Sequence, residues 1–285
     1  MSNTKIRIIL IVVGFALMVG CASLEKQSKP QAVPEIRPGI LQGYLPVEVL
    51  PNSLELIPPP PPVDGSTAFA LDKDVSMQNL ALQGTARWAL ATQDADLVFP
   101  QAADTFSCAL NAPITEQETP QLYMLLRRTL ADAGFSTYTA KNHYNRTRPF
   151  VVNNAPICTP EEVEALMNDG SYPSGHTAIG WAWALILTEI SPELTDAILA
   201  RGWAFGQSRT ICNVHWQSDV MMGRIMGATS VARLHSDPEF RAAIEASRGE
   251  LKAARARGLQ PTRDCQAEAD TLKEYPSLAP WPANK

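Results

Sequence analysis

The sequence predicts an all-α protein, a single helical-bundle domain with a buried central helix. No stretch alternates convincingly between apolar and polar residues with the period of two that a half-buried strand requires. A helix start signal recurs instead, in which Ser, Thr or Asp stands directly before a proline, at Thr119-Pro120, Thr159-Pro160, Ser191-Pro192 and Asp237-Pro238. Both observations favour a chain built from helices.

The individual helices follow from the spacing of apolar residues. We expect one helix from Ser76 to about Ala95 and another from Pro120 to a stop at Gly134. The stretch from Thr177 to Ile190 is apolar on nearly every side, so it should be the central helix. At about fourteen residues it is too short to span a bilayer. Trp181 and Trp183 within it should pack in the core.

Composition narrows the class of protein. The chain has 285 residues, which is enough for one sizeable domain with extensions. Its net charge of −5 gives no sign of a nucleic-acid surface. There is no CxxC or HExxH motif, so the sequence predicts neither a metal site nor another cofactor.

The first twenty residues have the organisation of a signal peptide. Lys5 and Arg7 precede a run of about a dozen apolar residues, which suits a signal core better than a membrane span. The segment Met18-Val19-Gly20-Cys21 resembles a bacterial lipobox, in which Cys21 is lipidated and becomes the new N-terminus. Ordinary cleavage after Ala22 is the alternative. Either way we expect export, and the lipobox predicts a periplasmic protein anchored by lipid to the outer membrane of a Gram-negative bacterium.

Four segments follow from these patterns. Residues 1–20 are the signal peptide, and residues 21–56 are polar and proline-dotted, as in a flexible tether. The folded domain is expected over residues 57–258, beginning at a polyproline run, and residues 259–285 should form a proline-rich C-terminal tail.

Four cysteines remain once Cys21 is set aside, and in an oxidising compartment they fit two disulfides. The sequence permits three pairings. We expect Cys158–Cys212, because that bridge would tie together two segments that carry polar motifs. Cys265 in the tail needs an anchor, and Cys108 is then the remaining partner; a bridge between Cys108 and Cys158 would contradict this assignment.

Three polar stretches are candidates for chemistry. In the stretch Ser208 to Asp219, a helix beginning near His215 would place Asp219 four residues on and on the same face, where it can orient the imidazole. The planar guanidinium of Arg209 can donate paired hydrogen bonds to an anion such as a phosphate or a carboxylate. Pro173-Ser174-Gly175-His176 precedes the central helix, whose first N–H groups favour an anion. The third stretch, residues 141–149, holds three cations.

Together these stretches resemble the tripartite signature of the type 2 phosphatidic acid phosphatase and vanadium haloperoxidase superfamily. Around the signature, from about residue 57 to 250, the chain is similar to the class A bacterial non-specific acid phosphatases. The signature positions are Lys141 and, after six residues, Arg148-Pro149; Pro173-Ser174-Gly175-His176; and Ser208-Arg209, followed after five residues by His215 and after three more by Asp219.

The resemblance implies an exported, metal-independent phosphomonoesterase of broad specificity. His215 would attack phosphorus and form a phosphohistidine, with Asp219 orienting it. His176 would protonate the leaving alkoxide and then activate water. Residues that would hold the phosphoryl group are Lys141, Arg148, Ser174, the backbone of Gly175, and Arg209. His143 and Arg146 lie outside the signature and are expected to be supporting or surface residues.

The expected partners are small phosphate monoesters and inorganic phosphate, with vanadate as an inhibitor. Nucleic acid is not expected, the membrane is reached only through the lipid anchor, and self-association stays open. A vanadium haloperoxidase is a first rival, but such enzymes are typically much longer. A lipid phosphatase would need several membrane spans, and no later apolar run is long enough. A non-catalytic anion-binding lipoprotein would need cations but no His215 nucleophile.

Overall fold

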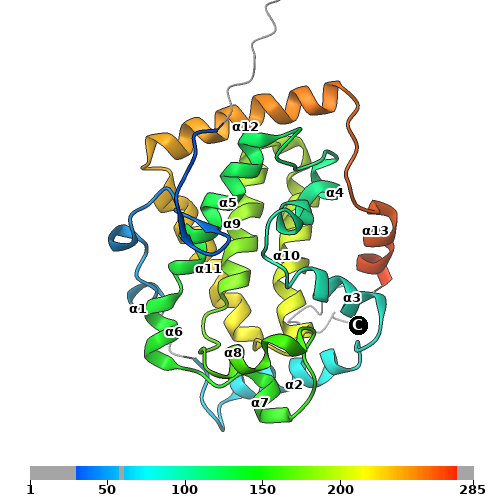
Figure 1. The fold of residues 1–285 in the computed structure, drawn as a ribbon. Helices are drawn as coiled ribbons and strands as arrows, with labels where there is room; N and C mark the ends of the chain where they lie inside the picture. Colours follow the sequence, from blue (N-terminus) through cyan, green and yellow to red (C-terminus); the bar gives the residue numbers. More distant parts are fainter. Residues whose placement is uncertain (1–29, 58–60, 275–285) are drawn as a thin grey trace, which may run out of the picture.

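Helix α9, Gly175–Ile190, is the buried centre of the molecule. In the computed structural model, which describes residues 30–57 and 61–274, three long helices surround it: α5 (Pro120–Phe135), α10 (Thr195–Ile211) and α11 (Gln217–Leu234). Helix α12, Pro238–Ala256, crosses one end of this bundle (Figure 1). The expected all-α fold and the central helix are therefore confirmed. Among the described residues, no helix is long and apolar enough to cross a membrane.

Glycines bring α10 and α11 into close contact with the central helix. A Cβ atom on Gly180 of α9 would lie 2.1 Å from the Phe205 ring on α10. A Cβ atom on Gly223 of α11 would lie 2.6 Å from the carbonyl oxygen of Ser174. Real Cβ atoms do not come this close to other heavy atoms, so glycine is required at both crossings. The second crossing lies at the N-terminus of α9, where the polar motifs meet.

One long expected helix is two helices in the structure. Residues Thr67–Leu80 form α2 and Ala86–Gln93 form α3, whereas the sequence predicted one helix from Ser76 to Ala95. The break falls at Gly84, which has a φ of +78°, a conformation that ends helices. Thr85 then caps α3 by accepting a hydrogen bond from the backbone N–H of Trp88.

The Asp237 start signal is confirmed, because its carboxylate accepts from the N–H of Phe240 at 2.8 Å. Thr119 stands before α5 as expected, but its hydroxyl bonds the loop at Pro113 and Thr115 instead of capping the helix. Trp183 is buried, whereas Trp181 is partly exposed. The remaining elements are η1 (Val47–Val49), α1 (Ser53–Leu56), η2 (Gln101–Phe106), α4 (Ser107–Leu110), α6 (Tyr138–Tyr144), α7 (Pro149–Asn153), η3 (Pro160–Glu162), α8 (Val163–Met167), η4 (Pro192–Leu194) and α13 (Cys265–Glu274).

Much of the segment expected as a tether is packed on the domain. Strands β1 (Glu35–Arg37) and β2 (Ile40–Leu41) form a small antiparallel sheet. The backbone N–H groups of Tyr44 and Leu45 then donate to the Asp132 carboxylate on α5, each at 3.0 Å. These contacts use main-chain donors and isolated apolar residues, so they leave no periodic pattern in the sequence. The expected signal peptide, Cys21 and residues 58–60 lie outside the described residues.

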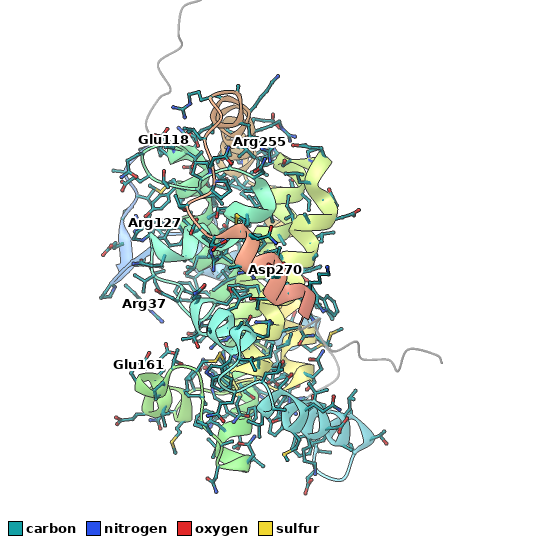
Figure 2. The ribbon with its side chains drawn as sticks, turned by 90° about the vertical axis from the view of Figure 1, so that its right-hand side faces the viewer. Arg37, Glu118, Arg127, Glu161, Arg255 and Asp270 are labelled. Atoms are coloured by element: carbon teal, nitrogen blue, oxygen red, sulfur yellow. A yellow bond between two sulfur atoms is a disulfide. The ribbon has the colours of Figure 1, made fainter. Side chains whose placement is uncertain are left out.

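The C-terminal segment also contains structure that its composition did not predict. Helix α13 lies along the outside of the bundle (Figure 2, where it carries Asp270). A disulfide joins its first residue, Cys265, to Cys108, and Glu268 of α13 pairs with the buried Arg201 at 3.3 Å. The second disulfide joins Cys158 to Cys212, so the structure contains both expected pairings.

Candidate active site

The three polar stretches meet at one end of the bundle, opposite α12, where α9 begins (Figure 1). Helix α6 and the loop that leads to α7 bring one stretch, and the start of α9 brings the second. The end of α10, the loop after it and the start of α11 bring the third. They surround a cavity of about 200 Å³. Its lining contains six of the eight predicted catalytic and phosphate-binding residues: Lys141, Arg148, Gly175, His176, Arg209 and His215.

His215 is held with one nitrogen facing the cavity cations. Its Nε2 atom lies 3.2 Å from Nη1 of Arg148, and its Nδ1 atom lies 3.4 Å from Oδ2 of Asp219. A guanidinium can only donate, so Nε2 is the acceptor and the ring proton is on Nδ1. The imidazole therefore presents the lone pair of Nε2 to the place where an anion would bind.

Helix α11 begins at Gln217, two residues after His215. The pair with Asp219 is therefore made across the helix start, and Oδ2 of Asp219 also accepts from the N–H of Trp216 at 2.8 Å. Burial, followed by the positive charges of Arg148 and Lys141, holds the pKa of His215 well below its usual range. The free base of His215 thus persists under acidic conditions.

His176 stands in the first turn of α9 and faces the same cavity. Its Nε2 atom lies 3.0 Å from the carbonyl oxygen of Ala95, which can only accept. Nε2 therefore carries a proton, and Nδ1 is the nitrogen left to exchange a proton with a substrate. Desolvation and the nearby Arg209 charge hold the pKa of His176 well below its usual range. No sequence pattern pointed to Ala95, because a backbone acceptor carries no side-chain signature.

Arg148 and Lys141 are fixed by main-chain carbonyls. Arg148 donates to the carbonyl of Val214 at 2.8 Å, and Lys141 donates to that of Gly170 at 2.7 Å. Arg209 differs from both. It is 1% exposed, and its Nε and Nη1 atoms have no hydrogen-bond partner within the described chain. Unsatisfied buried donors are costly, so Arg209 is arranged for an acceptor that a bound oxyanion would supply.

An acidic side chain lies beside two of these cations. Oδ2 of Asp169 is 2.9 Å from Arg148 Nη2 and 3.3 Å from Lys141 Nζ. The carboxylate is 37% exposed and lines the cavity. It therefore offers the two cations an internal anion where a phosphate would otherwise neutralise them. No sequence motif pointed to Asp169.

Two predicted residues lie behind the cavity wall. Ser174 is fully buried and caps α9, with its hydroxyl accepting from the N–H and the hydroxyl of Thr177. Its expected role as a phosphate donor therefore stays a prediction. Asp219 is also fully buried and reaches the cavity through His215. In residues 30–57 and 61–274, no group of three or more His, Cys, Asp or Glu side chains could hold a metal ion.

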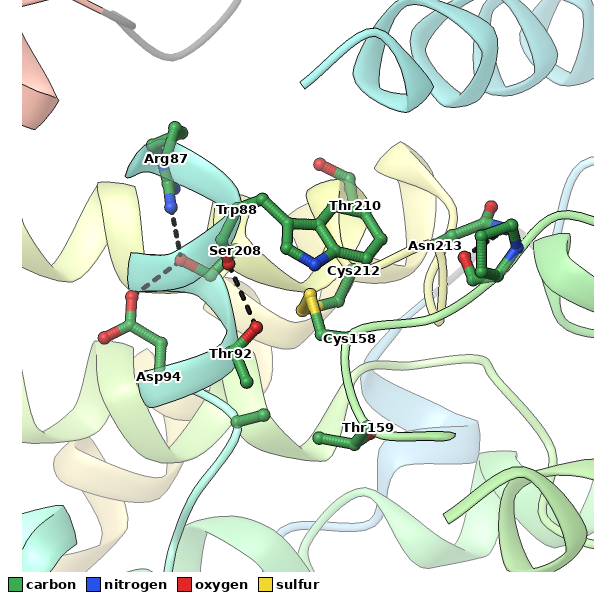
Figure 3. The surroundings of a disulfide bond; sticks show 12 residues. Arg87, Trp88, Thr92, Asp94, Cys158, Thr159, Ser208, Thr210, Cys212 and Asn213 are labelled. Carbon is green, nitrogen blue, oxygen red and sulfur yellow. Dashed lines mark hydrogen bonds between the residues drawn. A yellow bond between two sulfur atoms is a disulfide. The ribbon is translucent and has the colours of Figure 1, made fainter. Parts of the chain in front are cut away.

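A buried polar network supports the site from behind (Figure 3). Ser208 donates to the Asp94 carboxylate at 2.6 Å and accepts from Arg87 at 3.0 Å. Ser208 directly precedes Arg209, and Asp94 directly precedes Ala95, whose carbonyl binds His176. The network therefore holds the backbone next to both of these site groups. The Cys158–Cys212 disulfide lies close by and ties the chain after α7 to the end of α10.

The fold and the site together define a class of protein: a helical bundle with a pocket lined by three cationic side chains and two histidines. Residues 122–242 match the PAP2 superfamily. The chain is 46% identical over 201 residues to the non-specific acid phosphatase of Providencia stuartii, covering 70% of this chain and 81% of that protein. It is 43% identical over 194 residues to the non-specific acid phosphatase of Salmonella typhimurium, covering 68% and 78%. It is 44% identical over 202 residues to the acid phosphatase of Zymomonas mobilis, covering 71% and 76%.

This chain belongs to the non-specific acid phosphatases of the PAP2 superfamily, as the resemblance in its motifs predicted.

Asp169 should compete with phosphate for the cavity cations. We expect Asp169→Asn to lower the inhibition constant for inorganic phosphate by about threefold to tenfold, because it removes a negative charge beside Lys141 and Arg148. The measurement is competitive inhibition of aryl phosphate hydrolysis. Glu161→Gln, at an exposed carboxylate in η3, removes the same charge at a different place and is the control. Unchanged or weaker inhibition in Asp169→Asn would contradict the role assigned to it.

Proposed function

We propose that this acid phosphatase hydrolyses small phosphate monoesters, with broad specificity, in two steps through a phosphohistidine on Nε2 of His215. The observation that carries the proposal is the contact of this nitrogen, as an acceptor, with Arg148 in the lining of the cationic cavity. A simple anion-binding site would need the cations but no unprotonated imidazole among them. The two histidines supply both the nucleophile and the acid that phosphoryl transfer needs.

In the first step, the lone pair of His215 Nε2 attacks phosphorus and the bond from phosphorus to the ester oxygen breaks. His176 gives its Nδ1 proton to the departing alkoxide, which leaves as the alcohol. In the second step, His176 removes a proton from water as the water oxygen attacks phosphorus. The phosphorus–nitrogen bond breaks, its electron pair returns to His215, and inorganic phosphate leaves.

Positive charge in the cavity stabilises both transition states. Lys141, Arg148 and Arg209 are aimed at the equatorial oxygens, where negative charge is greatest. Metal ions supply this charge in many other phosphoryl-transfer sites, and here three side chains are available to supply it. We therefore propose that the reaction is independent of metal.

The nucleophile is tested by His215→Ala. We expect turnover to fall by at least about 10³-fold, because the variant loses the nitrogen that takes the phosphoryl group, and His176, the other imidazole in the cavity lining, is needed as the acid. Wild type should form an acid-labile phosphoenzyme that the variant lacks. In a separate test of metal independence, a chelator should leave the turnover of wild type unchanged. His235→Ala, at the C-cap of α11, is the control and should keep full activity. A phosphoenzyme in His215→Ala would exclude this mechanism, and loss of activity in chelator would exclude metal independence.

The pH dependence follows from the two histidines and Lys141. The depressed pKa of His215 keeps its free base available in acid, whereas His176 must be protonated and loses its proton as the pH rises. A bound phosphate dianion raises the pKa of His176 and so favours its acid form. Burial, followed by the charge of Arg148, lowers the pKa of Lys141 to about 8, so phosphate binding also weakens on the alkaline side.

We therefore expect a bell-shaped profile of kcat/KM with its maximum below neutrality. The measurement uses one aryl phosphate across the pH range in the presence of chelator. A maximum above the pKa of Lys141 would contradict the assignment of acid and nucleophile, because both His176 and Lys141 would then be neutral.

We also propose that the protein is exported and held at the outer membrane by a lipid on Cys21. The lipobox-like residues 18–21 and two disulfides that suit an oxidising compartment support this proposal. Wild type should sediment with membranes and be released by detergent, whereas Cys21→Ser should be soluble in the periplasm. A wild-type protein that is equally soluble would favour cleavage after Ala22.

A further inference from the structure

Arg146, which was predicted to be a supporting or surface residue, is buried between two carboxylates. Its Nη1 atom lies 2.5 Å from Oδ1 of Asp219, and its Nη2 atom lies 2.7 Å from Oδ2 of Asp72. The side chains of Arg146, Asp72 and Asp219 are 8%, 2% and 0% exposed. Charge pairs that are this well shielded from water interact strongly and hold one geometry.

Asp72 comes from α2 and also binds the first turn of α11. Its Oδ1 atom accepts from the N–H of Ser218 at 2.8 Å, and its Oδ2 atom accepts from the Ser218 hydroxyl at 2.6 Å. Arg146 donates to the same hydroxyl at 2.7 Å. Asp72, Ser218 and Arg146 thus form a closed set of contacts around the start of the helix that carries Asp219.

Aromatic rings limit the movement of the Arg146 guanidinium. Its central carbon lies 5.6 Å from the Phe69 ring centroid and 5.5 Å from the Trp216 ring centroid. Arg146 is absent from the lining of the cavity, in contrast to Arg148 two residues later. The geometry therefore does not present Arg146 to the phosphoryl group.

The two oxygens of Asp219 have different partners. Oδ1 accepts from Arg146, whereas Oδ2 accepts from the N–H of Trp216 and faces Nδ1 of His215. Arg146 at Oδ1 and the N–H of Trp216 at Oδ2 therefore together keep Oδ2 turned to the imidazole. Burial raises the pKa of Asp219 and the charge of Arg146 opposes that rise, so Arg146 favours the ionised carboxylate.

We propose that Arg146 is a positioning residue that holds Asp219 ionised and turned toward His215, with Asp72 anchoring the guanidinium. This inference rests on the proposed role of His215. Arg146 acts on the reaction through Asp219 and does not bind the substrate. Its loss should therefore impair the chemical step and leave phosphate binding by the cavity cations in place.

The test compares Arg146→Gln and Arg146→Lys with the matched control Arg128→Gln. Arg128 has a similarly buried side chain, 9% exposed, and it pairs with Glu239 on α12 and donates to the carbonyl of Gly43. The measurements are kcat, KM, inhibition by phosphate, and the pH profile of kcat/KM. Nitrogen NMR of labelled histidine reports the tautomer and pKa of His215 without turnover.

For Arg146→Gln we expect kcat to fall by about tenfold to a hundredfold, with phosphate inhibition within about twofold of wild type. The acid limb of the profile should move to higher pH, because Asp219 then binds a proton more readily. Arg146→Lys keeps the charge but cannot bridge both carboxylates, so its kcat and acid limb should be intermediate. Arg128→Gln should retain the wild-type profile.

Three results would overturn the proposal: a wild-type acid limb in Arg146→Gln, the same kinetic loss in Arg128→Gln, or a tenfold rise in KM and phosphate inhibition constant with kcat unchanged. If Arg146→Gln does not fold, Arg146→Lys decides, and a wild-type profile in that variant overturns it. The NMR readout separates this failure from failure of the proposed function. A shifted His215 tautomer or pKa in Arg146→Gln would support the positioning role even if another group were the nucleophile.

Discussion

Three positive side chains and two imidazoles share one small cavity at the end of the bundle, and the rest of the site depends on this concentration of positive charge. Burial lowers the pKa of Lys141 to about 8 and that of Arg209 to about 10. Keeping these side chains charged inside the protein therefore costs free energy. Main-chain carbonyls and Asp169 offset part of that cost around Lys141 and Arg148. Among the residues that the structure describes, Nε and Nη1 of Arg209 have no hydrogen-bond partner, and a bound phosphoryl group would supply one.

Burial and the same cations lower the pKa of both histidines. An isolated imidazole titrates near about 6.5, and these surroundings move His215 and His176 well below that value. Each ring is oriented by an acceptor outside the cavity, Asp219 for His215 and the carbonyl of Ala95 for His176. The two acceptors belong to separate buried networks, one through Arg146 and Asp72 and the other beside Asp94. The orientation of each imidazole therefore depends on buried groups that lie behind the cavity wall.

Local sequence predicted the helices well where a cap or an apolar face is strong. The uniformly apolar α9 and the Asp237 cap of α12 are examples. It predicted less where the deciding contact is distant. Residues 40–45 looked like tether because their partner, Asp132, is about ninety residues away and accepts from backbone N–H groups. Gly84 was missed as a break because the helical pattern continues on both sides of it.

The sequence by itself identified the family of this protein. The order and spacing of Lys141, Arg148, His176, Arg209 and His215 match the signature of the family, and these side chains also line one cavity. This was predictable because the proposed chemistry needs a nucleophile, an acid and cations, which only particular residue types supply. Only the tertiary structure decided which nitrogen of His176 is free and which carboxylates balance the cations. Those contacts join residues as distant as Asp72 and Ser218, or use a bare carbonyl such as that of Ala95. Such pairings depend on how helices pack, and helix packing leaves no local pattern in the sequence.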